Sequence, residues 1–138
     1  MSPQDVWNLS GKAVRVRTVR WKCEGREVFY TSTFGLTTFV TPDRTYLAVV
    51  EASNEAWSKS RLLILNADGT VRFAFDDRLE MQSGPKSLNF VGVTGTVNAS
   101  ASIVTVVAVP LGEDAFSITQ RMDLDAQTGV VLAVREAR

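Results

Sequence analysis

The sequence of 138 residues contains no histidine, and this absence excludes several kinds of catalytic site. Without imidazole there is no Ser-His-Asp or Cys-His catalysis, no histidine zinc site and no side chain that ordinarily titrates near neutral pH. Cysteine is almost absent as well, because Cys23 stands alone. One thiol cannot build a disulfide framework, a thiolate-rich metal site or an iron–sulfur cluster. We therefore expect no metal and no cofactor.

The sequence also lacks long hydrophobic runs, a secretory targeting signal and phosphate-binding motifs. The longest apolar run, Ile103–Val109, is strand-length and contains Thr105, whereas a membrane span needs roughly 18 apolar residues. The N-terminus lacks the basic start and apolar core of a secretory signal, and Asp5 interrupts the only candidate. No Gly-rich phosphate loop or dinucleotide fingerprint occurs. Together with the single cysteine, these absences predict a cytoplasmic protein.

Neither sign of charge dominates the composition. Lys and Arg number 15, Asp and Glu also number 15, and 45% of the residues are hydrophobic. This balance gives no bulk attraction to DNA or RNA, so it does not indicate a nucleic-acid partner. The length predicts a single globular domain over residues 1–138 that is large enough to bury roughly two-thirds of its unfolded surface.

Short segments with period-two alternation and frequent turns fill most of the chain. They predict an all-β fold: an antiparallel sandwich, a barrel or a strongly curved sheet of about nine short strands. The phase of alternation slips at Thr18–Val19, which predicts a bulge or bend in the first strand. Residues 1–11 are expected to be a lead-in with a short helical turn capped by Ser2, and residues 76–87 a loop. A mixed fold with a helix over Glu113–Met122 is the alternative.

Two stretches of the sequence, LNADGTVRFAF (65–75) and LDAQTGVVLAV (124–134), echo one another. They resemble the strand-turn-strand element of β-propeller blades, but a propeller needs at least four blades of about 40 residues. We interpret them as two hairpins with the same turn chemistry, in which Asp68 and Asp125 serve the turns rather than a calcium ion. Strict alternation then predicts six core residues: Val71, Phe73, Phe75, Val130, Leu132 and Val134.

Charged residues are segregated along the chain and provide the candidate binding residues. The acidic candidates are Glu51, Glu55, Asp76, Asp77 and Glu80, and the basic ones are Arg15, Arg17 and Arg20 in the first strand. The basic strand is either a docking surface for an anionic partner or an edge strand kept soluble by its charges. Trp57, in a polar connection, is either an exposed hot spot or a cap on the fold. Cys23 is interpreted as a buried or half-buried structural residue.

In size, charge segregation and lack of catalytic residue types, the chain resembles the small inhibitor or immunity proteins that bacteria pair with toxins. This resemblance implies a non-enzymatic protein that binds another protein, a toxin domain, through electrostatic steering and occlusion of its active site. It leaves the oligomeric state open. One alternative is a carrier of an apolar ligand lined by Phe73, Phe75, Phe90, Phe116 and Met122. A second is a carboxylate-dependent hydrolase built on Asp76, Asp77 and Glu80.

Overall fold

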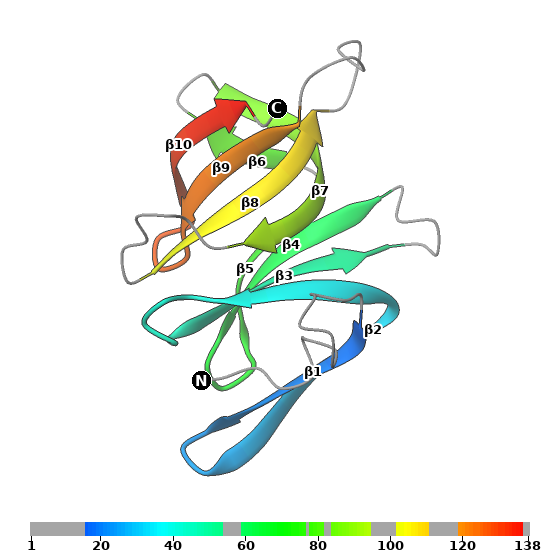
Figure 1. The fold of residues 1–138 in the computed structure, drawn as a ribbon, viewed down its shortest axis with the longest axis vertical. Helices are drawn as coiled ribbons and strands as arrows, with labels where there is room; N and C mark the ends of the chain where they lie inside the picture. The colour runs from blue at the N-terminus through cyan, green and yellow to red at the C-terminus, as the bar shows by residue number, and fades with distance from the viewer. Residues whose placement is uncertain are drawn as a thin grey trace.

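Ten strands and their turns make up the described part of the chain (Figure 1). The structure is a computed structural model that describes residues 16–53, 59–76, 78–81, 84–94, 102–110 and 119–136, with the backbone alone for residues 16, 78–81, 84–87, 110 and 136. The strands are β1 (Val16–Cys23), β2 (Arg26–Val40), β3 (Tyr46–Ala52), β4 (Ser60–Asn66), β5 (Val71–Phe75), β6 (Arg78–Met81), β7 (Gly84–Thr94), β8 (Ile103–Pro110), β9 (Gln120–Asp125) and β10 (Val130–Glu136).

The strands form two antiparallel five-stranded sheets in which neighbours along the chain are neighbours in space. The first sheet has the order β1-β2-β3-β4-β5 and the second the order β10-β9-β8-β7-β6. The all-β prediction is therefore confirmed. The expected loop over 76–87 is wrong, because Arg78–Met81 pairs with Gly84–Ser87. Ladder hydrogen bonds to a partner strand override the weak strand propensity of that segment.

One core lies between the two sheets. One face of β3 and β4 packs there against β7, β8 and β9. The buried members of this core are Ala48, Val50, Leu62, Ile64, Leu88, Phe90, Val104, Val106, Ala108, Met122, Leu124 and Ala126. The start of β4 is tied to β7 by hydrogen bonds, since Ser60 bonds the side chain of Asn89 and the carbonyl of Phe90.

A second core lies on the opposite face of β3 and β4, where β1 and β2 cover it. Its buried members are Val19, Trp21, Leu36, Leu47, Val49, Leu63 and Leu65. The indole Nε1 of Trp21 donates a hydrogen bond to the Ala67 carbonyl, 2.6 Å away, so β1 reaches the turn after β4. The first sheet is thus strongly curved, and its two central strands are buried on both faces.

The curvature of the first sheet comes from β2, which bends at Ser32–Gly35. Gly35 has a φ of 115°, and its backbone N–H and C=O both bond the Ser32 hydroxyl. The pairing of β1 shifts there too, from Leu36 opposite Val16 to Thr31 opposite Thr18. This irregularity confirms the predicted bulge in the first strand, displaced by about a residue. β2 is thus one bent strand that continues through Gly35.

The prediction of six core residues is wrong for four of them. Phe73 and Phe75 are half-buried against the inter-sheet core. Val71, Val130, Leu132 and Val134 are exposed, between 45% for Val134 and 58% for Leu132.

Two bulges on edge strands explain three of these four exposures, and the edge position of β10 explains the fourth. The register shifts between Val71 and Phe73, and again between Val131 and Ala133. Each shift adds a residue and breaks the period-two alternation. Val71 therefore faces away from Phe73, and Val131, not its neighbours, packs on the inter-sheet core. Val134 lies opposite the buried Met122 but stays exposed because β10 is at the sheet edge.

The turn interpretation of the two aspartates is confirmed by their hydrogen bonds. Asp68 accepts bonds from the backbone and the hydroxyl of Thr70, and Asp125 accepts one from the backbone of Gln127. Gly69 and Gly129 have φ values of 91° and 75°, the left-handed region that such turns require.

Three other expectations fall wholly or partly on residues that the structure does not describe. Residues 1–11, including the expected helical turn, lie outside the described residues. Of the alternative helix over Glu113–Met122, Gln120–Met122 belongs to β9, Thr119 is not helical, and residues 113–118 lie outside the described residues. Of the carrier lining, Phe90 and Met122 are fully buried in the inter-sheet core. No helix in the described ranges is long and apolar enough to cross a membrane.

Candidate functional site: a charged groove at the open end of the first sheet

An open groove of about 780 Å³ lies at one end of the curved first sheet. Its walls come from the bend of β2, the end of β3, the start of β4 and the residue after β5. The lining residues are Tyr30, Thr31, Ser32, Thr33, Phe34, Glu51, Ala52, Ser53, Lys59, Arg61 and Asp76. The groove therefore collects cations, carboxylates and two aromatic side chains from three strands and the residues beside them, which come together only in the folded protein.

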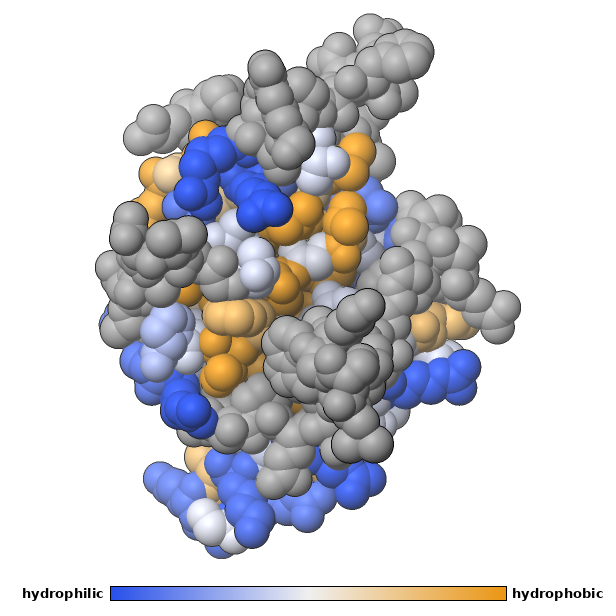
Figure 2. All heavy atoms as spheres, in the orientation of Figure 1, coloured by the Kyte–Doolittle hydropathy of each residue, from blue (hydrophilic) through white to orange (hydrophobic). Residues whose placement is uncertain are grey.

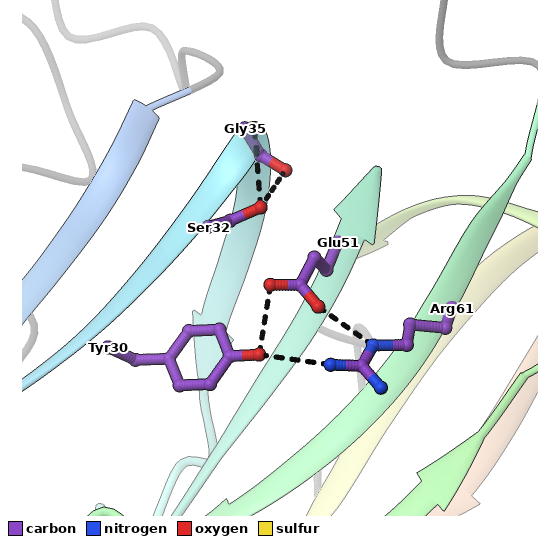
Figure 3. Close-up of polar contacts among 5 residues, drawn as sticks. All are labelled: Tyr30, Ser32, Gly35, Glu51 and Arg61. Carbon is purple, nitrogen blue, oxygen red and sulfur yellow. Dashed lines mark hydrogen bonds and ion pairs between the residues drawn. The ribbon is translucent and has the colours of Figure 1, made fainter. Parts of the chain in front are cut away.

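The wall of the groove is ordered by a network among Tyr30, Glu51 and Arg61 (Figure 3). Arg61 Nε donates to Glu51 Oε1 at 2.7 Å, and the Tyr30 hydroxyl donates to Glu51 Oε2 at 2.9 Å. Arg61 Nη2 lies 3.4 Å from the Tyr30 oxygen and closes the triangle. Glu51 and Arg61 are cross-strand partners in β3 and β4, so the sheet register holds the ion pair in place.

The network changes how Tyr30 ionises. Partial burial of the ring raises the pKa of Tyr30 above its ordinary value of 10.0, and the hydrogen bond and charge of Glu51 raise it further, while Arg61 opposes them. A Tyr30 phenolate would be poorly solvated by water and would be repelled by the Glu51 carboxylate. The neutral hydroxyl is therefore favoured. Tyr30 therefore acts as a hydrogen-bond donor that holds Glu51.

The acidic candidates meet the structure in different ways. Asp76 is exposed at the groove and Glu51 lines it. Glu51 is only 9% exposed, so it presents little carboxylate surface to a partner. It lies in β3, where Arg61 neutralises it. Glu55, Asp77 and the side chain of Glu80 lie outside the described residues, as does Trp57.

The two described basic candidates, Arg17 and Arg20, lie on the β1–β2 hairpin and do not line the groove. Arg17 and Arg20 are exposed on β1, and Arg20 lies 3.5 Å from Glu27 across the hairpin. β1 is the edge strand of its sheet, which is the arrangement that the charge-protection alternative requires. Arg15 lies outside the described residues. Cys23 is half-buried against the second core, in agreement with the structural interpretation.

Sequence reasoning missed Arg61 as a site residue, and it considered Tyr30 and Phe34 only as aromatics near the basic strand that could stack on bases. Arg61 and Tyr30 join the site through their hydrogen bonds to Glu51, which is 10 and 21 positions away in the sequence. The alternation of residues within one strand does not reveal such contacts between strands. The residues of the described part hold no group of three or more cysteine, histidine or acidic side chains that could bind a metal.

No protein-family model matches the chain, and no curated protein matches it. A solved structure does. A chain of "Structure of Tne2 in complex with Tni2" superposes with a TM-score of 0.79 at 22% sequence identity. The match covers 94% of this chain and 83% of that chain. Because the identity is low, the likeness shows a shared fold, and both curved sheets belong to it.

Proposed function

We propose that this chain is a non-enzymatic immunity-type protein that binds a toxin domain and blocks its active site. The observation that carries the proposal is the shared fold over nearly the whole chain with a member of a two-protein complex. That structure holds Tne2 in complex with Tni2, so a chain of this fold occurs there in a complex of two proteins. The absence of histidine and the single cysteine are in keeping with a protein that acts by binding.

The groove supports the proposal as a docking surface. It is open, it presents Lys59 and Asp76 as exposed charges, and Phe34 adds an apolar contact at its edge. The hydrogen bond that Arg61 donates to Glu51 holds the wall in place before binding. A preformed surface loses little entropy when a partner docks. Charges of both signs steer the encounter and set its orientation.

The experiment pairs the purified chain with the protein encoded beside its gene. We expect a stable complex in size-exclusion chromatography, a nanomolar or tighter Kd by calorimetry, and loss of toxicity when both are expressed together. The variant Asp76→Lys should weaken binding about tenfold or more, whereas Arg121→Glu, which reverses an exposed charge on β9 of the second sheet, should not. No complex and no protection would contradict the proposal.

A cytoplasmic location belongs to the same proposal and stays a prediction from the sequence. Fractionation of cells expressing the native gene tests it directly. Recovery from the soluble cytoplasmic fraction is expected, and recovery from another compartment would overturn this part alone.

A further inference from the structure

The outer face of the β1–β2 hairpin carries an exposed aromatic side chain among cations. Phe29 is 65% exposed, the largest exposure among the large hydrophobic residues of the described chain. It lies directly opposite Arg20 in the ladder, so the two side chains project from the same face. The neighbouring pair on that face is Lys22 with Glu27.

This face is held rigid from behind. The alternate residues of the same two strands, Val19, Trp21, Val28 and Tyr30, pack into the second core. On the outer face the hydroxyls of Thr18 and Thr31 lie 3.2 Å apart and join the strands. Phe29 is therefore fixed on a packed hairpin, and a fixed aromatic group binds a partner at low entropic cost.

The charge of the hairpin defines the partner. The exposed charges of the whole hairpin are Arg17, Arg20, Lys22 and Arg26 against Glu24 and Glu27. The face that carries Phe29 holds Arg20 and Lys22 against Glu27, so it is net positive by one charge. In Figure 2 the end of the molecule formed by this hairpin is mostly hydrophilic, whereas hydrophobic residues gather nearer the middle of that view. In Figure 1 the hairpin projects away from the second sheet. A net positive, projecting surface complements a negative one.

We propose that this outer face, with Phe29 as its apolar anchor and Arg20 beside it, docks on an acidic surface of the partner protein that contains an apolar pocket. The proposal rests on the proposed function and adds the chemistry of the partner. Thr31 links the hairpin to the groove, because it contacts Thr18 on this face and also lines the groove. The two surfaces thus adjoin. An acidic protein is favoured over RNA because Glu24 and Glu27 interrupt the cations and the whole chain is neutral.

The test measures binding of the full chain to the protein encoded beside its gene, with Phe29→Ala and Arg20→Glu as variants. Phe29→Ala should weaken the Kd about 30-fold or more, as expected for a hot-spot residue. Arg20→Glu should slow association and reduce its dependence on salt. The matched controls are Leu132→Ala, which removes a side chain of similar exposure (58%) on β10, and Arg121→Glu. Both should bind like the wild type, and circular dichroism and thermal melts verify that all variants fold.

The possible outcomes separate this proposal from the proposed function. If the wild type binds and both hairpin variants bind equally well, the hairpin surface is overturned while the immunity function stands. If the wild type forms no complex, both the hairpin surface and the immunity function are contradicted. Binding of a fluorescent single-stranded RNA that is lost in Arg20→Glu, with no effect of that variant on the protein complex, would assign the surface to nucleic acid and overturn an acidic protein partner.

Discussion

Arg72 on β5 and Gln127 in the turn between β9 and β10 join the two sheets. The Nε and Nη2 atoms of Arg72, on β5, donate hydrogen bonds to the Gln127 carbonyl at 3.0 and 2.8 Å. The guanidinium also lies over the rings of Tyr46 and Phe73, with its carbon 5.0 and 5.6 Å from their centres. The two stretches that echo one another in the sequence are therefore in direct contact in the fold.

We predict that Arg72→Ala lowers the free energy of unfolding by about 1–2 kcal/mol, because it removes two hydrogen bonds from a charged group and its contacts with the rings. Arg72→Lys should recover part of the loss, since a lysine keeps the charge but lacks the planar fork. Urea unfolding followed by circular dichroism measures both. Equal stability of Arg72→Ala and the wild type would show that this contact contributes nothing to sheet docking.

A second prediction concerns Gly129, whose φ is 75° and whose missing Cβ would lie 3.2 Å from the Phe73 ring. Gly25 is the matched control: its φ is 78°, and nothing lies within 4 Å of its Cβ position. Gly25→Ala should cost about 1–2 kcal/mol from the backbone alone. Gly129→Ala should cost about 1–3 kcal/mol more, because the methyl group also crowds the ring. Thermal melts and urea titrations compare the two, and similar losses would contradict the role of the ring contact.

Trp21 closes the second core and is fully buried. Replacing it with phenylalanine removes the indole donor from the Ala67 carbonyl and leaves unfilled volume. We expect Trp21→Phe to lower the free energy of unfolding by about 1–3 kcal/mol. Hydrogen exchange should accelerate most on β1 and β2, which cover this core. Protection lost equally throughout both sheets would argue against a separate second core.

The Tyr30–Glu51 contact predicts an alkaline transition. Because the pKa of Tyr30 is raised in the folded state, its contribution to stability is complete below pH 10 and is lost as the pH rises through the folded-state pKa. Subtracting the ultraviolet titration curve of Tyr30→Phe from that of the wild type isolates the signal of Tyr30, which should ionise above pH 10. Glu51→Gln should move this titration to lower pH, since the carboxylate that opposes the phenolate is gone. No movement would leave burial as the sole cause of the shift.

How far the sequence determines the site is shown by Glu51 and Arg61. Each was visible as a charged residue beside a strand, but their pairing depends on the register of β3 against β4, and Tyr30 joins them only because β2 bends at Gly35. Asp76 was predicted as a candidate and lies at the groove. Phe29 and Phe34 follow the basic strand in the sequence and were candidates to contact a partner for that reason, but their exposure was not predictable, because it depends on which face the neighbouring strands cover.

By itself the sequence determined the all-β class, most strand positions and the turn chemistry of Asp68 and Asp125, because alternation and turn propensity are local properties of the chain. Only the tertiary structure decided which residues face inward. The bulges at β5 and β10 turned Val71 and Leu132 outward. The curl of the first sheet buried both faces of β3 and β4 and brought the two echoing hairpins together. Such outcomes depend on contacts between strands far apart in the chain, which no local pattern encodes.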